Sequence, residues 1–238
     1  MGTVVSIDLR GGGDHAAAVA ALVAWFHEVD HRFSTYREDS EVSRVGRGEL
    51  RPADRSADLA EVLAACDRVR DLSGGRFDAW RGGRLDPSAY VKGWSVDRAV
   101  GLLDAHGCRD WMLNAGGDVR THGAPQPGLP WRVGVQHPRR RDAVAAVLAL
   151  RDGAVATSGE YERGHHIIDP HTGSHPEGVL SVTIVGWNLA LADAYATAAF
   201  AMGDRVAHHW VARLRGYAGM VILRDGRVLS TPSLRCAA

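Results

Sequence analysis

The chain has 238 residues, of which 45% are hydrophobic and 24% charged, so it can bury a sizeable core as one large domain or two small ones. Its 28 basic and 28 acidic residues cancel, which argues against a surface for nucleic acid or for an anionic membrane. No apolar run reaches the roughly 18 residues that a transmembrane helix needs, so we expect no membrane insertion.

The cysteines and the N-terminus bear on the cellular compartment. Cys66, Cys108 and Cys236 are scattered and odd in number, and none belongs to a CxxC pair, so neither a zinc site nor a disulfide framework is indicated. Residues 1–7 lack the basic and apolar regions of a signal peptide and read instead as a strand. We therefore expect a cytoplasmic protein with reduced thiols.

In the first part of the chain, we expect one strand followed by helical segments. Residues 3–10 predict a strand, and Asp14 is placed to cap a helix that runs to about residue 31. Residues 33–37 read as a polar-aromatic loop, and residues 39–42 as the start of a short helix. A second long helix is expected from Ser56 to Ser73, closed by the glycines that follow.

The rest of the chain is richer in strands. Residues 76–87 read as irregular, and a third long helix is expected over 88–105. Strands are expected at about 111–114, 118–122, 131–136, 145–150, 154–157 and 179–186. Helices are expected over 189–202 and 204–214, before a hairpin of 218–224 and 227–231 that turns at Asp225-Gly226. This order of elements predicts a mixed α+β chain rather than a regular βαβ repeat.

The expected helix at 189–202 carries the most informative polar pair. It is apolar almost all round, which is typical of a buried helix, yet Asp193 and Thr197 lie at i and i+4 on one face. A bare buried carboxylate costs several kcal/mol, so Asp193 should be paired or bound to metal. Two hard oxygen donors suit Mg²⁺. The structural alternative is that Asp193 pairs with an arginine and that Thr197 bonds its own helix backbone.

Other polar segments could contribute to the same site. Lys92 precedes a glycine near a helix start, where it could contact phosphate or could simply be exposed. Asp118 ends the turn 114–118, which is either an ordinary tight turn or a place where backbone lies against a ligand. Tyr36 could stack on an aromatic ring or belong to a packed loop.

The segment 157–173 supplies hydroxyls, glycines and a histidine. Thr157, Ser158 and Gly159 could approach a phosphate-rich ligand closely. His166 is followed by two isoleucines, so we expect it to begin a short apolar strand, either as a structural histidine or as part of the site. Residues 169–173 form a turn signature in their own right.

Taken together in chain order, these motifs resemble those of the ApbE family, flavin transferases that move FMN from FAD onto a protein serine or threonine. The most specific match is residues 157–173, with His166-Ile167-Ile168-Asp169-Pro170 followed by Thr172-Gly173. The other matching pieces are residues 1–3, 34–36, 39–41, 92–97, 114–118 and 192–203.

The resemblance implies a fold and a ligand set. It implies that residues 1–238 form a single domain with a T-fold-like core and an FAD cleft between lobes. The implied Mg²⁺ ligands, with Mn²⁺ as an alternative, are the Asp193 and Thr197 side chains and a backbone carbonyl near Val91. His166 is implied in transfer, Lys92 and residues 157–159 near phosphate, and Tyr36 and Asp118 along the cofactor.

The implied activity is transfer of FMN from FAD to a Ser or Thr hydroxyl of an acceptor protein, with release of AMP. His166 is the candidate base, because an imidazole titrates near neutral pH. The alternatives are an FAD pyrophosphatase and a flavin-binding protein without activity. The chain departs from the family pattern between 77 and 91, where the segment is shorter and Pro87-Ser88-Ala89 replaces a Gly-Gly. We expect this shortening to alter one wall of the cleft.

Overall fold

The computed structural model describes residues 3–160 and 167–237 and has three layers. Its helices are α1 (His15–Phe33), α2 (Glu41–Gly46), α3 (Ala57–Leu72), α4 (Ser88–Ala105), α6 (Leu189–Ala201) and α7 (Ala207–Val211), with a 3₁₀ turn at Pro52–Asp54. Its strands are β1 (Val5–Arg10), β2 (Trp80–Arg81), β3 (Arg84–Leu85), β4 (Asp110–Ala115), β5 (Asp118–His122), β6 (Trp131–His137), β7 (Arg140–Leu150), β8 (Ala154–Gly159), β9 (Val179–Gly186), β10 (Ala218–Leu223) and β11 (Val228–Ser230).

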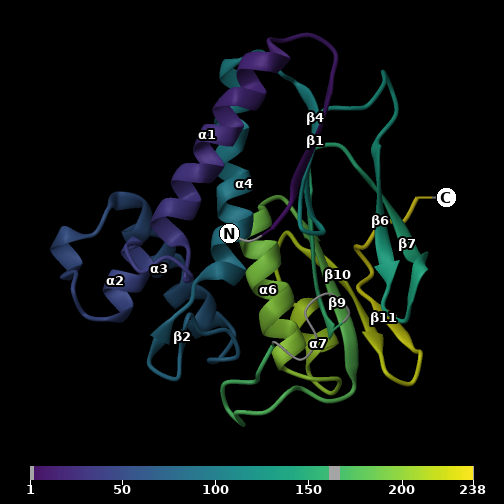
Figure 1. Ribbon diagram of the computed structural model, residues 1–238. Helices are drawn as coiled ribbons and strands as arrows, with labels where there is room; N and C mark the ends of the chain where they lie inside the picture. The colour runs from purple at the N-terminus through teal and green to yellow at the C-terminus, as the bar shows by residue number, and fades with distance from the viewer. Residues whose placement is uncertain (1–2, 161–166, 238) are drawn as a thin grey trace.

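The middle layer is a seven-stranded sheet in the order β1-β4-β5-β8-β9-β10-β11, and every neighbouring pair in it is antiparallel. Helices α4 and α6 cover one face, with α1 packed outside α4, and the β6–β7 hairpin lies against the other face (Figure 1). Because both faces are covered, the first six residues of the central strand β9 are all buried, the polar Ser181 and Thr183 included. The predicted mixed α/β class is confirmed.

Local signals set the helix boundaries. The side chains of Asp14, Ser40 and Ser56 each accept a backbone hydrogen bond at the first turn of α1, α2 and α3. Helix α3 ends before Gly74 and Gly75, which both have positive φ angles. These helix starts and ends are those that the sequence predicts.

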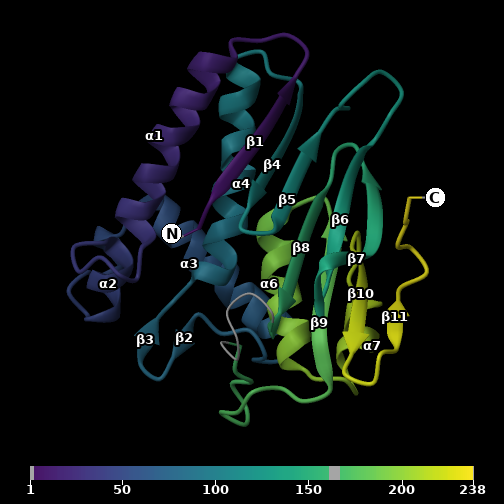
Figure 2. The same cartoon turned by 45° about the vertical axis from the view of Figure 1, so that its right-hand side comes forward.

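Three expectations about local structure need correction. Residues 76–87 are not wholly irregular, because β2 and β3 pair there as a small hairpin (Figure 2). Ile167 and Ile168 form no strand, because the turn that begins at Asp169 follows at once and Asp169 N donates to Ser174 O. Helix α7 spans only Ala207–Val211, because the hydrogen bonds that follow it, such as Leu214 N to Val211 O, have the tighter spacing of a turn.

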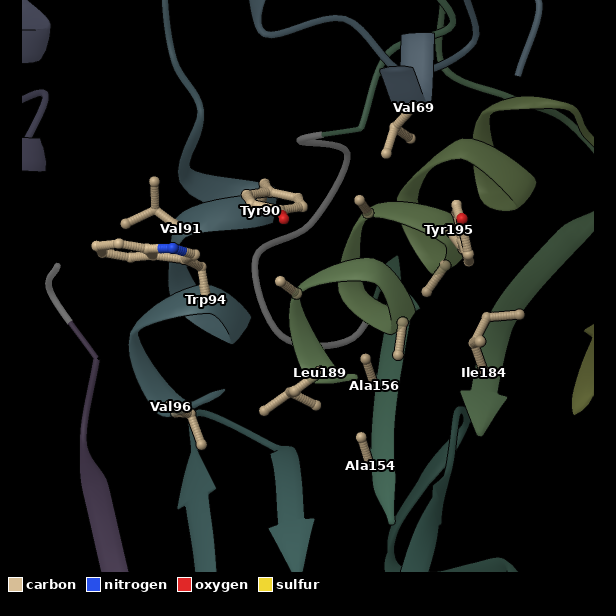
Figure 3. Packing of buried hydrophobic residues seen from close by; sticks show 14 of the residues in the cluster. Val69, Tyr90, Val91, Trp94, Val96, Ala154, Ala156, Ile184, Leu189 and Tyr195 are labelled. Carbon is tan, nitrogen blue, oxygen red and sulfur yellow. The ribbon is translucent and has the colours of Figure 1, made fainter. Parts of the chain in front are cut away.

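The core lies where α4, α6 and the sheet meet. Figure 3 shows Leu189 of α6 between Val96 of α4 and the two alanines Ala154 and Ala156 of β8. The small alanines allow α6 to lie close to the sheet. None of the helices in residues 3–160 and 167–237 combines the length and apolar character needed to cross a bilayer.

Candidate active site

A polar cavity of about 340 Å³ opens where α6, the start of α4, the end of β8 and the loop after α1 converge. Most of the residues predicted for the site line it. The full lining is Phe33, Ser34, Thr35, Tyr36, Arg81, Asp86, Ser88, Ala89, Val91, Lys92, Gly116, Thr157, Ser158, Gly159, Ile167, Asp193 and Thr197.

Helix α6 presents the predicted carboxylate–hydroxyl pair to this cavity. Its residues are buried except Leu191, as the all-round apolar sequence predicts. Asp193 and Thr197 are 4% and 8% exposed, and both line the cavity. One carboxylate oxygen of Asp193, Oδ2, is buried and has no hydrogen bond among the described residues. An under-satisfied buried carboxylate oxygen of this kind is a candidate ligand for a cation.

Lys92 lies between two carboxylates. Its Nζ is 2.6 Å from Asp118 Oδ2 and 3.6 Å from Asp193 Oδ2. Asp118 is 1% exposed, and its Oδ1 accepts a hydrogen bond from Thr157 N at 3.1 Å. Asp118 does not line the cavity itself but lies behind Lys92 and ties it to β8. Lys92 is therefore held by buried partners and is not a free surface lysine.

The electrostatics of Asp193 follow from this burial. Burial raises the pKa of the Asp193 carboxyl well above its ordinary value, because a charged carboxylate is poorly solvated there. The Lys92 charge opposes this rise, and the neighbouring Asp118 carboxylate adds to it. A bound cation would favour the charged form of Asp193.

Two further residues of the Lys92–Asp97 motif fix the distance between α4 and α6. A Cβ on Gly93 would lie 2.5 Å from the backbone C and O of Leu189, so only glycine allows this approach. Asp97 Oδ2 accepts hydrogen bonds from Leu189 N and Ala190 N at 2.8 and 2.9 Å, which caps α6. Asp97 Oδ1 also lies 3.2 Å from Arg120 Nε on β5. The motif thus clamps the helix that carries Asp193.

The end of β8 supplies the hydroxyls. Thr157 Oγ1 lies 2.9 Å from Thr183 Oγ1 of β9, and Ser158 Oγ lies 3.2 Å from Thr197 Oγ1 of α6. Gly159 ends the strand at the cavity wall. Ser158 therefore joins the strand to the carboxylate–hydroxyl pair, as the clustering of hydroxyls in this segment suggested.

Tyr36 stands at the edge of the cavity with 91% of its surface exposed. Its loop is anchored beneath it, because Ser40 Oγ donates a hydrogen bond to Ser34 O at 2.7 Å. An exposed ring on an anchored loop can stack on a flat aromatic ligand at little conformational cost.

His166 lies outside the described residues. The residues on either side of 161–166 are joined by His175, whose ring nitrogens lie 2.8 Å from Glu160 Oε1 and 3.1 Å from Ile167 O. Downstream, Asp169 forms an ion pair with Arg76 at 2.6 Å, which attaches the 169–173 turn to the residues after α3. The sequence reading did not identify His175, because its contacts depend on the folded chain.

The donor set suits a hard cation. Asp193 and Thr197 offer a carboxylate and a hydroxyl, and Val91, in the first turn of α4, also lines the cavity. No cluster of three or more His, Cys, Asp or Glu side chains arranged to hold a metal occurs in residues 3–160 and 167–237. A metal here would therefore rely on hydroxyl and backbone oxygens, or on a ligand's own oxygens, beside the carboxylate.

The sequence reading missed three cavity residues: Arg81 and Asp86, in the segment it took as irregular, and Ser88, which begins α4. A signal was present, because Gly82-Gly83 between Arg81 and Arg84 is a typical two-residue hairpin turn. Ser88 N donates to Asp86 Oδ1 at 3.1 Å, so Asp86 also helps to start α4.

Comparisons with known proteins agree with this architecture. The chain is 34% identical over 236 residues to the FAD:protein FMN transferase of Rhodobacter capsulatus, covering 95% of this chain and 42% of the relative. It is 28% identical over 266 positions to that of Vibrio cholerae, covering 86% and 80%. The chain thus spans under half of the first of these relatives and most of the second.

Solved structures share the fold. The flavin transferase ApbE from Vibrio cholerae superposes with a TM-score of 0.85 at 24% identity, covering 98% of this chain and 95% of that one. The ApbE protein from Thermotoga maritima superposes with a TM-score of 0.87 at 25% identity, covering 98% and 94%. The fold is therefore that of the flavin transferases.

The ApbE family model matches residues 1–83 and 79–221, which is most of the chain. The chain belongs to the ApbE family. The two matched pieces overlap at residues 79–83, so the break in the match falls at the β2–β3 hairpin.

Proposed function

We propose that this protein transfers FMN from FAD to a serine or threonine hydroxyl of an acceptor protein and releases AMP, with residues 1–238 acting as one catalytic domain. The carrying observation is the buried Asp193–Thr197 pair, which opens into the same cavity as Lys92 and Thr157–Gly159. The names of the relatives supply the reaction, and this cavity supplies the residues that suit it.

The position of each described residue in the cavity suggests which part of FAD it binds. Tyr36 stacks on a flat ring of FAD at the cavity edge. Thr157, Ser158 and Gly159 lie along the phosphates, where hydroxyls and backbone amides can donate hydrogen bonds. Lys92 holds Asp193 and Asp118 in place and adds positive charge beside the diphosphate.

Asp193, Thr197 and a backbone carbonyl near Val91 would hold the metal. Mg²⁺, or Mn²⁺ in its place, supplies charge neutralisation at the diphosphate and at the AMP leaving group when bound. Helix α6 and its Asp97 cap keep both side-chain oxygens on one face, a turn apart.

The transfer step balances as a phosphoryl substitution. The acceptor hydroxyl oxygen forms a bond to the FMN phosphorus while the bond from that phosphorus to the AMP oxygen breaks. His166 accepts the hydroxyl proton, and AMP leaves with the electron pair of the broken bond. Water in place of the hydroxyl would give free FMN and AMP instead.

The test is mass spectrometry of proteins incubated with the enzyme, FAD and Mg²⁺. We expect an acceptor peptide heavier by one FMN phosphoester, with AMP formed in equal amount. The isoalloxazine ring stays unsubstituted, so the labelled protein should fluoresce after denaturation. AMP and free FMN formed at the same rate with and without cell extract would identify a pyrophosphatase. Intact FAD after long incubation would identify a flavin-binding protein.

A further inference from the structure

Arg81 is the cavity's one cationic side chain without an acidic partner among the described residues. The charged side chains among the described residues that line the cavity are Arg81, Asp86, Lys92 and Asp193. Lys92 is already paired with Asp118 and lies near Asp193. The described lining therefore carries two acidic side chains, one engaged lysine and one unengaged arginine.

Within the hairpin, Arg81 faces another cation and no acidic side chain. In the β2–β3 register Arg81 lies directly opposite Arg84, so both side chains project from the same face. Neither guanidinium forms an ion pair with a carboxylate in the described part of the chain, and like charges directly opposite each other in a strand pair are destabilising. An anion bound in the cavity would give Arg81 the partner of opposite charge that the described residues do not provide.

Buried side chains and backbone hydrogen bonds fix the base of the hairpin and so fix the position of Arg81. Phe77, Ala79 and Leu85 at its base are buried in the main core. Asp86 N donates to Ala79 O at 2.7 Å, which closes the base, and Trp80 N donates to Asp78 Oδ1 at 2.8 Å. Arg81 lines the cavity from this anchored base, whereas Arg84 is exposed and does not line it.

We propose that Arg81 is a binding residue for the diphosphate of the substrate, supplied by the short hairpin that stands where the family has a longer segment. This inference rests on the proposed function. Lys92 is shared between Asp118 and Asp193, so its charge beside the diphosphate is partly neutralised, whereas Arg81 is the lining cation that has no acidic partner among the described residues. Guanidinium is suited to this task, because its forked donors match phosphate oxygens.

The test compares the binding of FAD and riboflavin to four proteins. They are the wild type, Arg81→Gln, Arg81→Lys and the control Arg84→Gln, which removes the same charge from the same hairpin outside the cavity. Dissociation constants are measured by fluorescence titration without turnover, and thermal melting checks that each variant is folded.

We expect Arg81→Gln to weaken FAD binding by about 10- to 100-fold, the worth of a charge-assisted hydrogen bond. Arg81→Lys should lie between it and the wild type, and Arg84→Gln should stay within about threefold of the wild type, because exposed charges are well screened. Riboflavin, which lacks phosphate, should bind all four equally.

Three results overturn the proposal. FAD bound equally by wild type and Arg81→Gln, with only the acceptor KM raised, would assign Arg81 to an acceptor carboxylate. Equal losses in Arg81→Gln and Arg84→Gln would indicate a general charge effect. An equal loss for riboflavin would indicate damage to the cavity. If the wild type itself binds no FAD, the proposed function fails instead, which keeps the two failures distinct.

Discussion

The two walls of the cavity differ in how tightly they are packed. One, the clamped wall, is formed by α4 and α6, and the other, the hairpin wall, is formed by β2 and β3. On one side, α4 and α6 approach so closely that Gly93 has no room for a side chain, and Asp97 bonds the first backbone amides of α6. On the other side, the β2–β3 hairpin has two residues per strand, and its glycine tip meets nothing within 4 Å.

This contrast matches two kinds of contact that differ in how accurately their atoms must be placed. The Asp193–Thr197 pair and Lys92 lie on the clamped wall, where burial and ion pairs hold each atom. The break in the family match falls on the hairpin wall. The position of a cation ligand must be kept to a fraction of an ångström, whereas a diphosphate contact can be supplied from differently built segments.

The largest effect should come from removing the carboxylate on the clamped wall. Asp193→Ala should abolish metal-dependent turnover, because the site loses its charged ligand, and Thr197→Val should weaken turnover by removing one oxygen while keeping the shape. Both variants should fold, since each replaces a buried polar group with an apolar one in an apolar helix. Initial rates of AMP release with graded Mg²⁺ measure this. Activity that persists in Asp193→Ala or in excess EDTA would contradict the assignment.

A smaller loss is expected at His166. Replacing it with Ala or Gly should cut transfer by roughly 10²–10⁴-fold, the usual worth of a general base, and should leave FAD binding nearly unchanged. Single-turnover rates and FAD titrations separate the two effects. His165→Ala is the matched control and should matter far less. If it is the more damaging change, the assignment of the base moves to that residue.

The close contact between α4 and α6 should be disrupted by a single added Cβ atom at Gly93. Gly93→Ala should destabilise the fold by about 1–3 kcal/mol and lower activity, because the new Cβ meets the backbone of Leu189 and forces α6 away. Gly101→Ala in the same helix is the control, since nothing lies within 4 Å of its Cβ. It should stabilise the fold by up to about 1 kcal/mol through helix propensity. Urea unfolding measures both. Equal stability of the two variants would show that the helices can separate freely.

The smallest expected effect is the slow alkylation of the buried Cys66, which tests whether the base of the hairpin stays closed. Burial raises the pKa of the Cys66 thiol from 9.0 to about 12, with Asp78 and Asp86 contributing. Its thiolate fraction at pH 8 is then about 10³-fold below that of an ordinary thiol, and only the thiolate is alkylated. Iodoacetamide should label exposed Cys236 and leave Cys66 intact, as peptide mapping would show. Rapid labelling of Cys66 in the folded protein would mean that the hairpin base opens readily.

The sequence predicted several helix ends, and the polar pair on the clamped wall, because these signals are local. The caps at Asp14 and Ser56, the glycines after α3 and the apolar periodicity of α6 act over a few residues, and the structure has them as expected. The i and i+4 spacing of Asp193 and Thr197 placed two oxygens on one face before any fold was known.

What escaped prediction depends on pairs far apart in the chain. Lys92 meets Asp118 because α4 and β5 pack near each other, and the approach at Gly93 depends on α6, about 95 residues later. The two-residue strands of the hairpin were too short to show alternation, so only their turn carried a signal. Ile167 and Ile168 have strand-forming side chains, but the Asp169 turn overrides that propensity.

The hairpin tip is also a position where residues can be inserted into the chain. Gly82 and Gly83 both have positive φ angles and open space around them, and the strands below them are closed by Asp86 N and Ala79 O. Residues inserted there would leave the base unmoved, and each doubling of a loop costs only about 0.6 kcal/mol of closure entropy. Length can therefore be gained at this point in small, tolerable steps, so a new recognition segment grafted at the tip would leave the wall that carries Asp193 unaltered.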